Sequence, residues 1–197
     1  MREVALLVTP VLPEPGSSGR AWRAYDWLTT LGRRYSTMCV LAHPRPHQSA
    51  HDGVDVFDLG PALRVTTGGW QRVGWLCPLA AVLTRRVVSD WVHGGGDLAS
   101  ELAVLQRRLS GRRVARIVVF RLYLHDVGRR LQALFPEARL ELDCDDVESA
   151  TRWDIAAAQW RLGRPLNALL DALGALQYRL VERRLLAAHA RVWFAAQ

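Results

Sequence analysis

The sequence predicts a single α/β domain in which helices cover both faces of a parallel, doubly wound β-sheet. Short apolar runs of strand length alternate with longer segments whose apolar residues recur at helical spacing, an order typical of parallel sheets. Most of the strand-like runs are continuously apolar, as expected of strands that are buried on both faces. The length of 197 residues fits one domain, so we expect residues 1–197 to form one folded unit.

The amino-terminal part is expected to open with a strand, a glycine-containing loop and a helix. The apolar run Glu3–Thr9 predicts a strand, and the segment PVLPEPGSSG that follows it predicts a long loop. Apolar residues at helical spacing between positions 21 and 31 predict a helix, with Ser17 or Ser18 as its N-cap and Gly32 near its end. These three elements are the opening of a β-α-β unit.

The rest of the chain continues the alternation of strands and helices. The run VARIVVF is the most β-branched in the chain and predicts a central strand. Leucines at positions 166, 169, 173, 176 and 180 predict a long amphipathic helix that reaches about residue 189. The other expected strands span residues 36–42, 54–59, 139–143 and 190–196, and the other expected helices run from about residue 79, over 97–109 with Asp97 as its cap, and over 127–135.

Composition excludes several classes of function. All 26 basic residues are arginine, so chemistry that needs a lysine ammonium, such as a Walker A loop, a kinase-type lysine or a Schiff base, is ruled out. The net charge is +7, but the arginines are scattered and no aromatic ribonucleoprotein motif accompanies them, so we expect no nucleic-acid partner. Three widely spaced cysteines in apolar segments indicate reduced thiols in a cytoplasmic protein. We expect no metal and no cofactor.

Three polar features follow predicted strands, and ligands bind parallel sheets at that end of their strands. The first is the loop of Gly16, Ser17, Ser18, Gly19 and Arg20, whose glycines and helix amides would suit phosphates or sugar hydroxyls; the alternative is a plain turn. The second is Arg121, which closes the central strand and is suited to bidentate binding of a carboxylate or phosphate. Its alternative role is an ion pair with Asp143 or Asp145.

The third feature is a dense acidic cluster in LELDCDDVES, at the end of the strand 139–143. Strand alternation places Leu140 and Leu142 on one face and Glu141 and Asp143 on the other. The simplest role for the acids beyond the strand, Asp145 or Asp146, is to cap the next helix, but one cap does not account for so many carboxylates.

Three further patterns each have a simpler interpretation beside the functional one. DCDDV fits the loose Asp-x-Asp-x-Val pattern of haloacid dehalogenase-type phosphatases, yet the lysine partner of that family is missing and few residues follow. Three histidines between positions 43 and 51 are spaced like metal ligands on a helix, but the intervening prolines forbid that helix. The tryptophan- and arginine-rich region Trp70–Trp91 suits peripheral contact with an anionic membrane as well as it suits core packing.

Read in order, LLVTPVLPEPGSSGRAWRAYDWLTTL, ARIVVFRLYL, ARLELDCDDVES and VERRLLAAHARVWFAA resemble the amino-terminal half of a GT-B glycosyltransferase, and more narrowly the retaining family-four enzymes. The resemblance implies a Rossmann-like domain that holds the acceptor, while a carboxyl-terminal domain holds most of the nucleotide-sugar. Motifs of that second domain are missing from this sequence, so we expect the lone chain to be inactive and to need a carboxyl-terminal partner.

The resemblance also implies roles for residues. It places the loop Gly16–Arg20 near the donor phosphates, and it places Arg121 and the segment from Asp143 to Glu148 on the acceptor side. Asp145 and Asp146 are the residues expected to contact an acceptor hydroxyl or to orient Arg121. The alternative hypothesis is a non-catalytic binding or scaffold module that forms a homodimer or pairs with another protein, marked by an exposed apolar face on the long helix.

Overall fold

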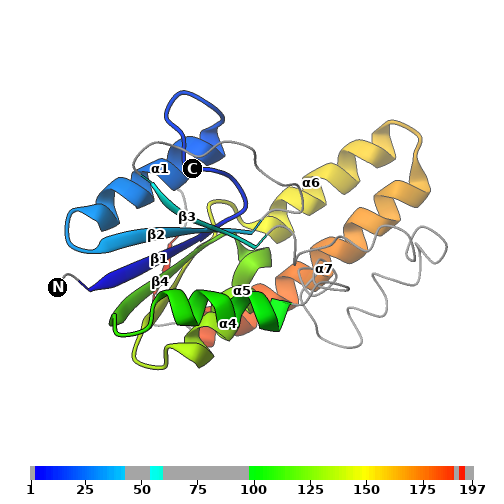
Figure 1. Ribbon diagram of the computed structural model, residues 1–197. Helices are drawn as coiled ribbons and strands as arrows, with labels where there is room; N and C mark the ends of the chain where they lie inside the picture. The colour runs from blue at the N-terminus through cyan, green and yellow to red at the C-terminus, as the bar shows by residue number, and fades with distance from the viewer. Residues whose placement is uncertain (1–2, 43–53, 60–97, 189–190, 194–197) are drawn as a thin grey trace.

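The computed structural model describes residues 3–42, 54–59, 98–188 and 191–193. Its six strands form one parallel sheet in the order β3-β2-β1-β4-β5-β6, so the fold is α/β and Rossmann-like, as the sequence predicts (Figure 1). The strands are β1 Val4–Thr9, β2 Ser36–Leu41, β3 Asp55–Asp58, β4 Val114–Phe120, β5 Arg139–Asp143 and β6 Val192–Trp193.

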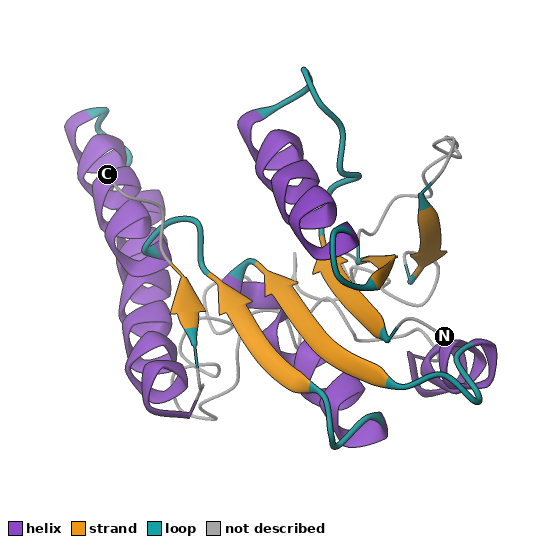
Figure 2. Ribbon diagram, turned by 90° about the vertical axis from the view of Figure 1, so that its left-hand side faces the viewer, coloured by secondary structure: helices purple, strands orange, loops and turns teal. Residues whose placement is uncertain are grey.

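Helices lie on both sides of the sheet (Figure 2), which explains why the strand sequences are continuously apolar. On β1, Leu6 packs into the larger core cluster together with residues of α4 and α5, whereas Leu7 packs into a smaller cluster with α1. The helices are α1 Gly19–Gly32, α4 Leu98–Arg108, the short 3-10 helix η2 Leu122–Leu124, α5 His125–Leu134, α6 Glu148–Arg161 and α7 Pro165–Ala188.

The predicted strands and most predicted helices are confirmed to within a few residues where the structure describes them; of the expected strand 190–196 it describes residues 191–193. The N-cap of α1 is Ser18, whose hydroxyl accepts a hydrogen bond from the backbone N–H of Ala21 at 3.2 Å. The alternation predicted for β5 also holds, because Leu140 and Leu142 belong to the larger core cluster and Glu141 and Asp143 face the α1 side. The expected helix from residue 79, the cap at Asp97, the histidine loop and the region Trp70–Trp91 lie outside the described residues.

Helices α6 and α7 pack against each other as a hairpin that reaches away from the sheet (Figure 1). Arg152 joins them through an ion pair with Asp171 at 3.2 Å. The long helix was predicted correctly, but its leucine stripe does not enter the core: Leu166 is 63% exposed and Leu169 57% exposed. None of the described helices is long and apolar enough to cross a membrane.

The sheet order reverses between its two central strands, β1 and β4. From β1 the chain first builds outward through β2 and β3, and it then returns to add β4, β5 and β6 on the other side. At such a switch point the loops beyond the two central strands diverge to opposite faces and leave a crevice in which α/β proteins bind their ligands. The two central strands end at Thr9 and Phe120, so the crevice is expected between the loops that follow these residues.

Candidate functional site at the carboxyl end of the sheet

A crevice of about 800 Å³ lies at this switch point. Its lining comes from the loop after β1, the start of α1, the residue after β4 and the loop after β5. The structure therefore brings together the three predicted features, of which the first and the last are more than 100 residues apart in the sequence. The predicted site residues that line the crevice are Ser18, Gly19, Arg20, Arg121, Asp145 and Asp146.

The rest of the predicted loop after β1 does not line the crevice. Gly16 and Ser17 precede the α1 N-terminus in an exposed turn, where Gly16 has φ +81°, a conformation that favours glycine. Ser18 uses its side chain to cap α1, as described above. Gly19 and Arg20 are exposed at the first turn of α1, so this end of the helix presents its amino-terminal dipole and one guanidinium to the crevice.

Arg121 is buried beneath the acidic loop, with 3% of its side chain exposed. One of its terminal nitrogens lies 2.7 Å from Asp145, and the other lies 3.2 Å from both Asp146 and Glu148. The predicted ion pair between Arg121 and Asp145 is thus observed, whereas the alternative pairing with Asp143 is wrong. Because three carboxylates pair with the two terminal nitrogens of its guanidinium, Arg121 organises the acidic loop, and those two nitrogens are not available for bidentate binding of a ligand.

The backbone at this point is strained. Arg121 has φ +93° and Asp145 has φ +55°, both unusual for residues with a side chain. The N–H of Arg121 donates to the carbonyl of Asp143 at 2.8 Å, which continues the sheet ladder into the turn. Left-handed conformations of this kind cost about 1–3 kcal/mol each and persist where surrounding contacts hold them, a pattern common at functional sites.

Asp143 is completely buried and is bound from α1 rather than by Arg121. Arg23 donates to both of its carboxylate oxygens, at 2.7 and 2.8 Å, and the indole N–H of Trp27 donates to one of the same oxygens. The hydrogen bond to Asp143 raises the pKa of Arg23. Sequence reasoning missed Arg23 and Trp27; their i, i+4 spacing on the face of α1 that meets the sheet was the available signal.

The carboxylates after β5 differ in exposure. Asp146 has 50% of its side chain exposed, compared with 17% for Asp145 and 14% for Glu148. Burial raises the pKa of Glu148, and the opposing attraction of Arg121 is the smaller effect. Asp145 also lies 3.3 Å from Arg23, so two arginines hold it, and Asp146 is the carboxylate most available to a ligand.

The idea that Asp145 or Asp146 caps the next helix is wrong. Helix α6 begins at Glu148. Val147 occupies the N-cap position, and its side chain makes no capping hydrogen bond. Instead, the carboxylate of Glu182 on α7 accepts hydrogen bonds from the N–H and the hydroxyl of Ser149. With the cap supplied from α7, the two aspartates are left in the crevice.

The geometry also disfavours the phosphatase interpretation. Asp143, the first aspartate of the DCDDV pattern, is fully buried under Arg23 and Trp27 and offers no exposed oxygen to a substrate. Within the described ranges, no three histidine, cysteine or acidic side chains are grouped so as to hold a metal ion.

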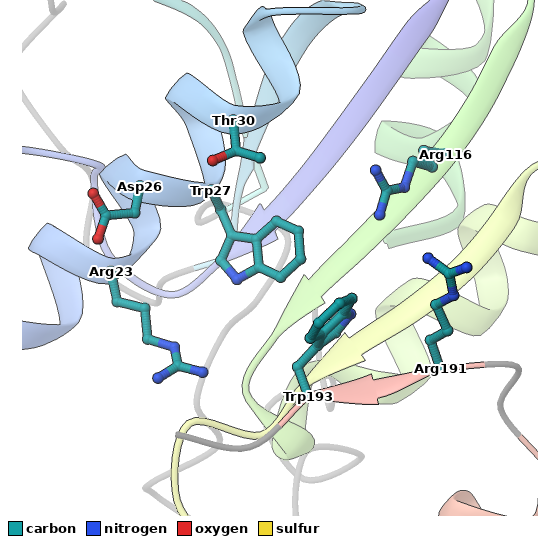
Figure 3. Close-up of a pocket in the computed structure, with 7 residues that line it drawn as sticks. All are labelled: Arg23, Asp26, Trp27, Thr30, Arg116, Arg191 and Trp193. Atoms are coloured by element: carbon teal, nitrogen blue, oxygen red, sulfur yellow. The ribbon is translucent and has the colours of Figure 1, made fainter. Parts of the chain in front are cut away.

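A second hollow of about 470 Å³ lies beside the crevice, on the α1 side of the sheet (Figure 3). The indole rings of Trp27 and Trp193 meet there edge to face, with centroids 6.0 Å apart. Arg116 forms an ion pair with Glu141 on the floor of the sheet, and Arg191 points into the same space. Arg23 and Asp26 line both the hollow and the crevice, so the two spaces adjoin at this part of α1.

Comparison of the chain with protein-family models, with curated proteins and with solved structures finds no match.

Proposed function

We propose that the chain is the acceptor-side domain of a retaining GT-B glycosyltransferase, which transfers a sugar from a nucleotide-sugar donor to a hydroxyl. The observation that carries the proposal is the crevice at the switch point, where a helix N-terminus with Arg20 faces an acidic loop with Asp146. The order of motifs along the sequence supports the same assignment.

The two walls of the crevice differ in charge, and this difference suits a sugar nucleotide and an acceptor. The α1 wall provides the dipole of the helix N-terminus and the exposed guanidinium of Arg20, which favour phosphate oxygens. The opposite wall provides Asp146, whose exposed carboxylate accepts hydrogen bonds from sugar hydroxyls. In this proposal Asp146 contacts the acceptor, while Asp145 and Arg121 fix the shape of the loop that carries it.

In the transfer step a bond forms between the acceptor hydroxyl oxygen and the anomeric carbon of the donor, the bond from that carbon to the phosphate breaks, and the nucleoside diphosphate leaves. Because the hydroxyl of a retaining enzyme attacks from the face that the phosphate leaves, the departing phosphate oxygen takes the hydroxyl proton in this proposal. Asp146, half-exposed and the most available of the three carboxylates in the loop, orients the hydroxyl through a hydrogen bond. We propose that a carboxyl-terminal domain or partner closes over the crevice and contributes most of the donor contacts.

The experiment is a binding and transfer assay with a panel of nucleotide-sugars and free sugars. Saturation-transfer NMR on the chain should detect donor or acceptor binding, and Asp146→Asn and Arg20→Gln should each weaken it. Arg34→Gln, which removes the same charge as Arg20→Gln but at an exposed position after α1, should leave binding unchanged.

Transfer is then measured with and without a candidate carboxyl-terminal partner. We expect transfer only in the completed enzyme and a loss of about 100-fold in Asp146→Asn, the size expected when a contact that positions the attacking hydroxyl is lost. A chain that binds no sugar and no nucleotide but forms a stable dimer would instead support the scaffold module.

A further inference from the structure

The turn between α6 and α7 exposes an unusual group of apolar side chains. Trp160 and Leu162 are each 68% exposed and Leu166 is 63% exposed, the three highest values among the large apolar side chains of the described residues. They lie at the end of the hairpin that points away from the sheet (Figure 1). We call residues 160–166 the hairpin tip.

The hairpin tip is ordered by its own backbone. The N–H of Leu162 donates to Ala158, that of Gly163 donates to Trp160, and that of Arg164 donates to Gln159. Gly163 has φ +71°, the left-handed conformation that lets the chain reverse after α6. The exposed tryptophan and leucines are therefore held outward by a defined turn.

Charge at the hairpin tip has a single sign. Arg161 and Arg164 are both exposed, and the sequence has no carboxylate between Asp154 and Asp171. The apolar surface continues from the tip into a groove of about 340 Å³ between the two helices, with Trp153 and Leu169 at its sides and alanines along it.

We propose that the hairpin tip docks on the surface of an anionic lipid bilayer. Trp160, Leu162 and Leu166 enter the boundary between headgroups and acyl chains, where tryptophan is favoured because its ring is apolar and its N–H is polar. Arg161 and Arg164 meet the lipid phosphates at the same level. The proposal does not depend on the function proposed for the crevice.

The charge of the hairpin tip favours a bilayer over a second copy of the chain as its binding partner. In a twofold dimer that joins the hairpin tips, each copy presents the same patch to the other, so Arg161 and Arg164 would lie against a patch that is itself positively charged. No carboxylate from residues 155–170 is present to neutralise them. An anionic headgroup layer neutralises both arginines and also accepts the tryptophan and the leucines.

The experiment is cosedimentation of the chain with sucrose-loaded vesicles of phosphatidylcholine alone or with 30 mol% phosphatidylglycerol. We expect binding to the anionic vesicles and little to the neutral ones. The triple variant Trp160→Ser, Leu162→Gln, Leu166→Gln should lose about ten-fold or more of the partition coefficient. The double variant Arg161→Gln, Arg164→Gln should lose about thirty-fold, because each basic residue near an anionic surface contributes about one kcal/mol.

The controls place an apolar-to-polar change and a double arginine-to-glutamine change at exposed helix positions elsewhere. Val104→Gln on α4 and the pair Arg129→Gln, Arg130→Gln on α5 should bind as the unmodified chain does. Failure of the unmodified chain to bind anionic vesicles, or equal binding by the triple tip variant, would overturn the proposal. So would light scattering that shows a dimer lost in the triple variant without vesicle binding, since the tip would then serve self-association.

Discussion

At the scale of single residues, the acidic loop is held by one buried guanidinium. Arg121 meets Asp145, Asp146 and Glu148 from a left-handed backbone conformation at the end of the central strand. Removing the arginine would leave carboxylates close together and partly buried, and an uncompensated charge in such surroundings is costly.

Replacing Arg121 by alanine should therefore destabilise the protein by about 3 kcal/mol or more, as measured by urea unfolding followed by circular dichroism. Arg34→Ala, at an exposed position, should change stability by about 0.5 kcal/mol or less. A loss for Arg121→Ala no larger than that of the control would show that the three ion pairs do not hold the loop.

Glu148 gives the site a pH dependence of known sign. Burial raises its pKa above the ordinary value of 4.5, so the folded chain binds this proton more tightly than the unfolded chain does. From pH 4.5 upward to the raised pKa, the native state therefore carries more protons at this group than the unfolded state. The contribution of Glu148 to stability consequently falls as the pH rises through that window.

In Glu148→Gln this dependence should disappear. The free energy of unfolding of the unmodified chain, minus that of the variant, should decrease between pH 4.5 and 7.5 in urea titrations at several pH values. Glu137→Gln, at a side chain that is 77% exposed, should show no such trend. A difference that stays constant with pH for Glu148→Gln would contradict the assignment.

Several site residues could be predicted from the sequence, but apart from the pairing of Arg121 with Asp145 their partners could not. Arg121 and the acids after β5 were recognised because each follows an apolar strand, where parallel sheets bind ligands. The pairing of acids with arginines depends on the side chains of α1. Arg23 and Trp27 bind Asp143, and Arg121 pairs with the carboxylates of the loop after it. Contacts between residues about 120 positions apart carry no local signal.

At the scale of elements, helix α5 packs closely on the sheet at a glycine. A Cβ added at Gly128 would clash with the side chain of Val119 on β4 and would press on Leu140 of β5 at 3.1 Å. The lack of a side chain at this position thus sets how near α5 lies to the central strands.

Gly128→Ala should destabilise the protein by about 1–3 kcal/mol, because the helix has to move away from the sheet or Val119 has to leave its rotamer. Gly174→Ala is the matched control within α7: its added Cβ meets no atom within 4 Å, and the change should stabilise the protein by about 0.5–1 kcal/mol. Thermal unfolding of both variants would check the two signs, and equal effects would refute the close packing.

Elements inside the core were easier to predict than the hairpin outside it. Strand runs such as β4 are set by burial on both faces, which leaves a plain apolar signature. On α7 the same leucine spacing indicated a helix correctly, but the residues buried along it include Ala168, Ala175 and Tyr178 rather than the leucine stripe. Periodicity identifies an apolar face, and it does not say what covers that face.

At the scale of the whole molecule, the parallel order of the strands followed from the alternation of elements, but their positions in the sheet did not. A right-handed crossover could have placed β4 beside β3, and the switch point arises because β4 pairs with β1 instead. The crevice is therefore a property of topology that no single segment encodes.

The centre of this sheet should open only when the whole domain unfolds. Cys39 lies in β2, is fully buried and pairs in register with Leu7 of β1 and Val56 of β3. Burial raises the pKa of its thiol to about 12, so almost no thiolate forms at neutral pH.

Labelling of Cys39 by a maleimide at pH 7.5, mapped by mass spectrometry, should follow the same urea midpoint as circular dichroism. Asp146→Asn serves as a control, because a change in the crevice should leave the agreement between the two curves intact. Labelling of Cys39 well below the unfolding midpoint would mean that β2 separates from its neighbouring strands before the domain unfolds.

The ion pair between Arg23 and Asp143 fixes a wall that the crevice and the tryptophan-lined hollow share, because Arg23 lines both. Breaking the pair would strip a fully buried carboxylate of its counter-charge, which costs several kcal/mol. The guanidinium of Arg23 is therefore already held in place, and a ligand that enters either space meets a side chain that needs no reorganisation.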